Sequence, residues 1–99
     1  MKPVAVITGA AQGIGKRTAE VLATRGFDLV LNDLQSPSAT LKNVQAIGAT
    51  AIEALGDVSS ESVVLEMVRK TQDAFGRVDA LVNNAGISRS EERRVGKEC

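Results

Sequence analysis

The chain has no histidine, tyrosine or tryptophan, and its 99 residues include two phenylalanines and one cysteine, Cys99. Without histidine and with a single cysteine, a transition-metal site has few ligands to draw on, so we expect no metal centre. A lone cysteine also cannot form an internal disulfide. The scarcity of aromatic side chains removes the stacking platforms on which single-stranded nucleic acids bind.

Net charge and long apolar runs are absent as well. Twelve basic and twelve acidic residues cancel, so the charge gives no reason to expect binding to nucleic acid or to an anionic membrane. No apolar stretch approaches the roughly 20 residues of a membrane-spanning helix, and the N-terminus lacks a signal-peptide pattern. We therefore expect a cytoplasmic protein without a membrane partner. The length predicts one small domain of marginal stability.

Short β-rich runs alternate with helical patterns along most of the chain. Strands are predicted at residues 3–8, 27–32, 50–55 and 78–82. Helices are predicted at residues 14–25, after Ser36-Pro37-Ser38 up to Gly48, and from Ser59 or Ser60 up to Gly76. This βαβαβαβ order is typical of an α/β protein with a parallel, helix-covered sheet, and right-handed crossovers predict the strand order 3-2-1-4.

Apolar spacing predicts which side of each helix faces the sheet. The predicted inward residues are Ile14, Thr18, Val21 and Leu22 in the first helix, Leu41, Val44 and Ile47 in the second, and Val64, Met67, Val68, Thr71 and Phe75 in the third.

A glycine-rich turn joins the first predicted strand to the first predicted helix, with the sequence Thr8-Gly9-Ala10-Ala11-Gln12-Gly13-Ile14-Gly15. Glycine permits a positive φ and lets a ligand approach the backbone. The first N–H groups of the helix have no partner within the helix and lie at its positive end, so the turn favours a dinucleotide pyrophosphate. Its spacing, G-x3-G-x-G, differs from the G-x-G-x-x-G of the general dinucleotide fingerprint.

Asp33 follows the second predicted strand, 18 residues after Gly15. An acidic residue there accepts hydrogen bonds from the adenosine ribose hydroxyls of NAD, whereas the 2′-phosphate of NADP would meet like charge. Gln12 in the glycine turn is neutral and offers such a phosphate no cation. The alternative is that Asp33 is an ordinary surface residue that begins a loop.

Polar residues also follow the third and fourth predicted strands. Asp57 and Val58 could bracket an adenine ring with an acceptor and an apolar contact, or Asp57 could only cap the third helix. Asn83-Asn84-Ala85-Gly86 combines small residues, which permit close approach of a cofactor, with amides that can bond a ribose or the backbone. The alternative for this segment is a plain turn that ends the strand.

Residues 89–99 differ from the rest, with seven charged side chains in eleven positions. The segment cannot form the next βα unit. It could be a solvated charged tail or a small basic patch for a partner, but it resembles the translation of sequencing-adapter DNA. We therefore expect residues 1–88 to be a truncated dinucleotide-binding domain and residues 89–99 to be a non-native tail.

Together, T-G-A-A-Q-G-I-G, Asp33, G-D-V and L-V-N-N-A-G-I resemble the short-chain dehydrogenase/reductase family over residues 3–88, most closely its 3-oxoacyl-[acyl-carrier-protein] reductase type. The resemblance implies the N-terminal half of a Rossmann-type doubly wound sheet that prefers NAD to NADP. It implies that Asp33 selects NAD and that the Asn83 and Asn84 amides brace the sheet. The other implied cofactor contacts are Gly9, Gln12, Gly13, Ile14 and Gly15 at the pyrophosphate, Asp57 and Val58 at adenine, and Asn84, Ala85 and Gly86 at the adenosine ribose.

The chain also departs from the family pattern. Family catalysis uses a serine, a Tyr-x-x-x-Lys pair and an asparagine beyond the fourth strand, and this chain has no tyrosine, so no catalytic residue can be assigned. We expect an inactive cofactor-binding portion of an oxidoreductase. The full-length protein would be a homo-oligomer that moves hydride between nicotinamide and an alcohol/ketone pair, including 3-oxoacyl thioesters. The alternatives are a non-catalytic nucleotide-binding or redox-sensing module, or a fragment without function.

Overall fold

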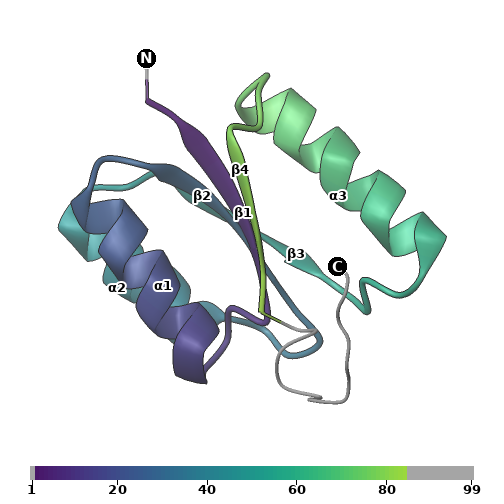
Figure 1. The fold of residues 1–99 in the computed structure, drawn as a ribbon, viewed down its shortest axis with the longest axis horizontal. Helices are drawn as coiled ribbons and strands as arrows, with labels where there is room; N and C mark the ends of the chain where they lie inside the picture. The colour runs from purple at the N-terminus through teal and green to yellow at the C-terminus, as the bar shows by residue number, and fades with distance from the viewer. Residues whose placement is uncertain (1, 85–99) are drawn as a thin grey trace.

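Strands and helices alternate through residues 2–84, the part of the chain that a computed structural model describes (Figure 1). The elements are β1 (Val4–Thr8), α1 (Gly13–Thr24), β2 (Asp28–Asp33), α2 (Ser38–Ile47), β3 (Ala51–Leu55), α3 (Glu61–Ala74) and β4 (Ala80–Asn83). All strand pairs are parallel and the sheet order is β3-β2-β1-β4. The predicted α/β class and strand order are confirmed.

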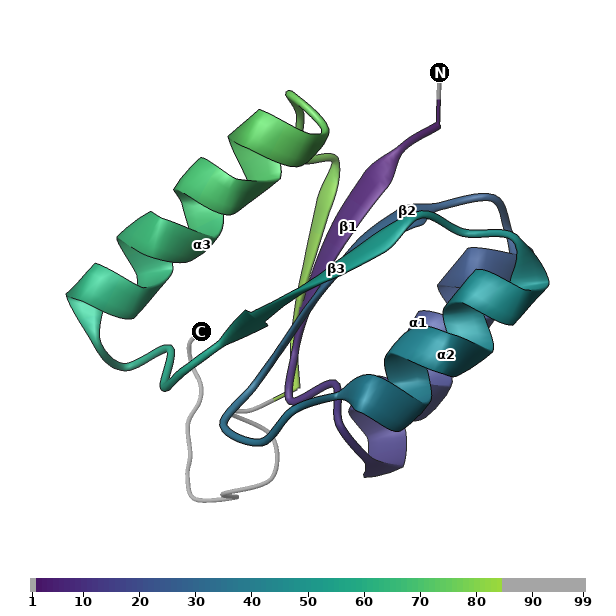
Figure 2. The ribbon, with the colours of Figure 1, turned by 180° about the vertical axis from the view of Figure 1, so that it is seen from behind.

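The sheet lies between two helical layers, with α1 and α2 on one face and α3 on the other (Figures 1 and 2). Side chains of β1 alternate between two apolar clusters: Ala5 and Ile7 pack with residues of α1 and α2, while Val4 and Val6 pack with Met67 of α3. All five residues of β1 are buried. Because β1 lies between β2 and β4, the loop that follows it emerges at the middle of the sheet.

The predicted inward face of α1 is confirmed for Leu22, which packs against the apolar cluster under the helix, and is wrong for Ile14 and Val21. Its buried residues are Gly15, Ala19 and Ala23, while Ile14 and Val21 are 66% and 41% exposed. Small residues let the helix backbone lie close to the sheet, whereas a prediction from apolar spacing gives most weight to the largest side chains. The face in contact is therefore set by the space available for each side chain as well as by its hydrophobicity.

The predictions for α2 and α3 are partly confirmed. Val44 is fully buried in α2, and Met67 and Thr71 are buried in α3, whereas Ile47 and Val68 are 45% and 48% exposed. The predicted end of α2 is confirmed, because Gly48 caps it in the left-handed conformation at φ +115°. The helix begins one residue later than a Ser36 cap would place it, with Pro37 at the N-cap.

Strand β4 is less covered than its apolar sequence suggests. Leu81 pairs in register with Val6 and so lies on the α3 face, where it remains 66% exposed. Val82 is partly buried against the α1 and α2 side. Ala85, Gly86 and the predicted tail 89–99 lie outside the described residues. Within residues 2–84, no helix has the length and apolar character needed to cross a bilayer.

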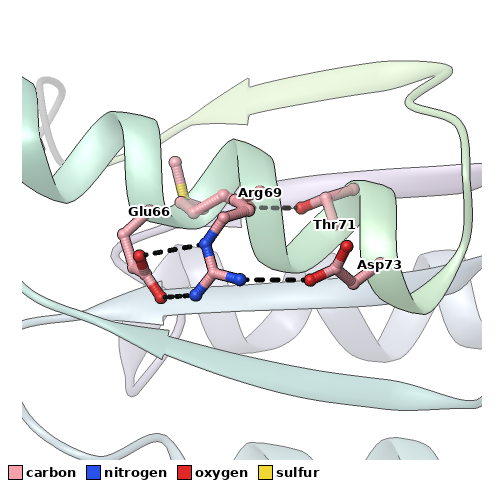
Figure 3. A network of polar contacts seen from close by, with 5 residues as sticks. Glu66, Arg69, Thr71 and Asp73 are labelled. Carbon is pink, nitrogen blue, oxygen red and sulfur yellow. Dashed lines mark hydrogen bonds and ion pairs between the residues drawn. The ribbon is translucent and has the colours of Figure 1, made fainter.

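An exposed ion-pair network runs along α3 (Figure 3). The Arg69 guanidinium donates to Glu66 at 2.7 Å and to Asp73 at 3.2 Å. The hydrogen bond from Arg69, followed by its charge, lowers the pKa of Glu66. Each of these side chains is at least half exposed, and the pairs are three and four residues apart along the helix. Exposed pairs of this kind contribute little to stability. These ion pairs therefore lie on the exposed surface of α3 and do not define a binding site.

Candidate cofactor-binding site

The loop from β1 to α1 presents backbone N–H groups at the carboxyl edge of the sheet. Gly9 and Gly13 adopt the left-handed conformation, at φ +65° and +64°. Gln12 is the N-cap of α1 but makes no side-chain cap hydrogen bond, and the first turn contains no acidic residue. The Lys16 N–H bonds to the Gln12 carbonyl at 3.4 Å, so the preceding N–H groups lie at the positive end of the helix, a suitable place for an anion.

Gly15 brings the helix and the loop into close contact. A Cβ at Gly15 would lie 1.9 Å from the Gly9 carbonyl oxygen, whereas a Cβ at Gly13 would have no atom within 4 Å. Gly15 is therefore required for packing, and Gly13 for its conformation and for the open space beside it. A closely packed loop with an open side fits the approach of a diphosphate to the backbone.

Two neighbouring elements hold the loop at Ala10. The Ala10 N–H donates to the Asn32 carbonyl at 2.9 Å, and the Thr40 hydroxyl donates to the Ala10 carbonyl at 2.7 Å. Thr40 is fully buried in α2. Sequence reasoning missed Thr40, although it lies four residues before the buried Val44, at helical spacing on the inward face.

The Asp33 carboxylate lies beside the glycine loop, at the end of β2. Its Oδ2 accepts from the Ala11 N–H at 2.9 Å, and its Oδ1 accepts from the Gln35 N–H at 3.3 Å. Asp33 therefore does close a local turn, as the alternative interpretation proposed. It also bonds directly to the loop, which an ordinary surface aspartate would not do.

Asp57 and Val58 lie in the connection from β3 to α3. The Asp57 carboxylate accepts from the Ser59 N–H and its carbonyl from the Ser60 N–H, each at 2.9 Å. Ser60 is the N-cap, so Asp57 braces the turn before α3 instead of capping the helix. Val58 packs at the margin of the apolar cluster below α3. An acceptor and an apolar surface thus stand next to each other at this edge of the sheet.

The end of β4 completes this edge of the sheet. The Thr8 hydroxyl donates to Asn83 Oδ1 at 2.9 Å, which joins β1 to β4 and confirms the bracing role expected of Asn83. Asn84 is 8% exposed, and its Nδ2 is the buried side-chain nitrogen that has no hydrogen-bond partner within residues 2–84. A buried donor without a partner is costly, so Asn84 offers a site for an acceptor.

The described residues bring the predicted positions together at one edge of the sheet: the glycine loop after β1, Asp33 at the end of β2, Asp57 and Val58 after β3, and Asn84 after β4. No group of three or more histidine, cysteine, aspartate or glutamate side chains in this part of the chain is arranged to hold a metal ion. A groove of about 390 Å³ between β3 and α3 is lined by Ile52, Glu53, Arg69, Lys70, Asp73 and Ala74, none of which is a predicted site residue. This arrangement defines a protein of the dinucleotide-binding parallel-sheet class.

Comparisons with known proteins identify the family within this class. The model of the short chain dehydrogenase family matches residues 3–97. The chain is 44% identical over 98 residues to a (2S)-[(R)-hydroxy(phenyl)methyl]succinyl-CoA dehydrogenase subunit of Thauera aromatica, covering 97% of this chain and 40% of that protein. It is 43% identical over 89 residues to a 3-oxoacyl-[acyl-carrier-protein] reductase of Synechocystis, covering 87% and 36%.

A solved structure agrees with these relatives. The 3-oxoacyl-[acyl-carrier protein] reductase of Brucella melitensis, in complex with NAD, superposes with a TM-score of 0.81 at 37% identity, covering 87% of this chain and 34% of that one. The chain therefore belongs to the short-chain dehydrogenase/reductase family, whose members are NAD(P)-dependent oxidoreductases, and it resembles the 3-oxoacyl-[acyl-carrier-protein] reductase type. It spans 40% or less of the length of the relatives named here.

Proposed function

We propose that the chain binds NAD in preference to NADP and forms the cofactor-binding part of an oxidoreductase. The observation that carries this proposal is the Asp33 carboxylate, which the Ala11 N–H holds at 2.9 Å beside the glycine loop. In support, two similar solved structures, from Brucella melitensis and Burkholderia phymatum, are complexes with NAD.

Each part of the edge receives one part of the dinucleotide in this proposal. The open N–H groups of the loop and of the first turn of α1 receive the pyrophosphate, and Asp33 accepts from the adenosine ribose hydroxyls. Asp57 and Val58 receive the adenine ring, and the Asn84 amide donates to the ribose. The full set of proposed contacts is Gly9, Gln12, Gly13, Ile14, Gly15, Asp33, Asp57, Val58, Asn84, Ala85 and Gly86.

Charge decides between the two dinucleotides. A 2′-phosphate on the ribose would lie against the Asp33 carboxylate, and two like charges about 4 Å apart repel by about 1 to 4 kcal/mol, depending on the surrounding dielectric. Such a cost corresponds to at least about a fivefold preference for NAD. Gln12 in the loop carries no charge that would offset it.

Calorimetric titration of the purified chain with NAD and NADP tests the assignment. Asp33→Asn removes the charge and should reduce the preference for NAD, whereas Asp28→Asn should retain it. Asp28 is a suitable control because it lies at the opposite end of the same strand, where its carboxylate accepts from the Thr50 N–H at 3.0 Å. Equal affinity of the unchanged protein for NAD and NADP would contradict the proposal.

The proposed chemistry is hydride transfer between the nicotinamide ring and an alcohol/ketone pair, which the bound cofactor would supply. We propose 3-oxoacyl thioesters as the substrate class, since the Thauera relative is a subunit of a (2S)-[(R)-hydroxy(phenyl)methyl]succinyl-CoA dehydrogenase and the Synechocystis relative is a 3-oxoacyl-[acyl-carrier-protein] reductase. The residues of this chain would bind and orient the dinucleotide. The chain contains no tyrosine, so the proton donor expected from the family pattern would have to be supplied by other residues.

A further inference from the structure

Asn32 is a buried polar residue near the carboxyl end of β2, one position before Asp33. It is 2% exposed, and its Nδ2 donates to the Ala54 carbonyl at 2.8 Å and to the Gly56 carbonyl at 3.1 Å. The side-chain amide has two N–H groups, so both are used. A buried amide is stable only when its hydrogen bonds are made, and here both bonds reach the end of β3 and the residue that follows it.

These bonds hold Gly56 from two sides. The Gly56 N–H donates to the Asp33 carbonyl at 3.0 Å, while the Gly56 carbonyl accepts from Asn32. Gly56 adopts φ +129°, and a Cβ there would lie 2.8 Å from a methyl group of Val63. The chain direction at Gly56 is therefore tightly specified. The next two residues are Asp57 and Val58, so the bonds at Gly56 determine where those side chains begin.

Asn32 also reaches the glycine loop through its backbone, because its carbonyl accepts from the Ala10 N–H at 2.9 Å. One residue thus bonds to the loop proposed for the pyrophosphate and to the turn proposed for adenine. We propose that Asn32 is a positioning residue for adenine recognition: its side-chain amide fixes the turn that carries Asp57 and Val58 relative to the glycine loop. This inference rests on the proposed function of Asp57 as the acceptor for the adenine amino group.

Asn32→Asp is the most direct test, because aspartate has nearly the same shape but its carboxylate would face two carbonyl oxygens without a donor. Asn43→Asp is the matched control, since the Asn43 amide makes an exposed hydrogen bond to Glu20 at 2.9 Å on α2, away from the turn. The probes are NAD and nicotinamide hypoxanthine dinucleotide, which differ at the adenine amino group. The measured quantity is the ratio of their affinities.

The ratio of the two affinities distinguishes an effect on the position of the adenine-binding turn from an effect on the stability of the protein. A partly unfolded variant lowers both apparent affinities by the same factor and leaves their ratio unchanged. One hydrogen bond to the amino group should give the unchanged protein an approximately three- to tenfold preference for NAD. We expect Asn32→Asp to bring this ratio close to one and Asn43→Asp to retain it. If Asn32→Asp does not fold, Asn32→Ser, which keeps one donor, should lower the ratio partially.

The outcomes distinguish the inference from the proposed function. If the unchanged protein discriminates between the two dinucleotides and both Asn32 variants discriminate equally well, the inference is wrong and the cofactor assignment stands. If the unchanged protein binds both dinucleotides equally, Asp57 does not bond to the adenine amino group. The inference then fails together with the proposed role of Asp57. If it binds neither dinucleotide, the proposed function itself is wrong.

Discussion

Replacement of Gly15 by alanine tests the close contact on which the glycine loop depends. The added Cβ would lie 1.9 Å from the Gly9 oxygen and 2.7 Å from the Gly9 carbonyl carbon, whereas real Cβ contacts are essentially never shorter than 3.0 Å. The atoms that clash belong to the backbone and cannot rotate away, so α1 and the loop must separate by about 1 Å. Overpacking of this kind costs about 1 to 3 kcal/mol, and we expect the upper end.

A helix-propensity effect acts in the opposite direction. Alanine within a helix is favoured over glycine by about 1 kcal/mol, so the expected net loss for Gly15→Ala is about 2 kcal/mol. That corresponds to a fall in Tm of about 8 to 16 °C for a domain of this size. Urea unfolding followed by circular dichroism measures the loss, and calorimetric titration with NAD should show weaker binding because the loop has moved.

Gly26→Ala provides the control, because Gly26 has φ +91° and open space around it, at the far end of α1. Its strain should cost about 1 to 2 kcal/mol without changing the affinity of the folded protein for NAD. The reasoning is refuted if Gly15→Ala is as stable as the unchanged protein, or more stable, since helix propensity would then be the only effect present.

Three further predictions concern a loop contact, an acid-sensitive contact and the reaction. Thr40→Val removes the bond to the Ala10 carbonyl and should cost about 1 to 2 kcal/mol in urea unfolding, with weaker NAD binding by calorimetry; unchanged values would contradict the anchoring role. The hydrogen bond from Arg77, followed by that from the Val4 N–H, lowers the pKa of Asp79 from 3.8. The ionised Asp79 carboxylate therefore stabilises the fold above pH 3.8, and this contribution is lost as the pH falls through the lowered pKa. Asp79→Asn lacks this carboxylate, so its free energy of unfolding, measured in urea, should fall less between pH 5 and about pH 2 than that of the unchanged protein. The purified chain should not oxidise NADH with a ketone above a buffer blank in an absorbance assay, because it has no tyrosine; turnover that depends on chain and ketone would contradict this.

The origin of residues 89–99 is a separate prediction. We expect the coding DNA to change to adapter sequence at or just after codon 89, because of the charge-rich composition of this segment and its resemblance to translated adapter. The family match extends to residue 97 and therefore includes part of the segment. Sequencing of the genomic locus checks the prediction, and a locus that encodes Glu91 to Cys99 without interruption would contradict it.

The strand order and the position of the glycine loop could be predicted because they depend on features that repeat or are spaced along the sequence. Alternating β and α patterns with right-handed crossovers leave few sheet orders, and glycine is favoured where φ is positive, as at Gly9 and Gly13. The inward face of α1 could not be predicted in the same way. Gly15 and Ala19 have little apolar surface, and their place against the sheet depends on how closely the backbones approach in three dimensions.

The buried polar contacts were also beyond sequence reasoning. Asn32 and Thr40 occur among apolar neighbours, and their partners are backbone carbonyls of Ala54, Gly56 and Ala10, which any residue type can provide. Asp33 was located from its distance to Gly15, but its bond to the Ala11 N–H required the loop geometry. Residue type therefore indicates which side chains need hydrogen-bond partners, and only the fold shows which atoms those partners are.

The two bonds at Ala10 bear on how the loop would meet a ligand. Its N–H donates to the Asn32 carbonyl, and its carbonyl accepts from the Thr40 hydroxyl. A segment that the protein's own hydrogen bonds hold in place loses little conformational entropy when a ligand binds, so more of the contact energy remains as affinity. Association of the ligand should accordingly resemble docking to a rigid surface, and its rate should not be limited by ordering of the loop.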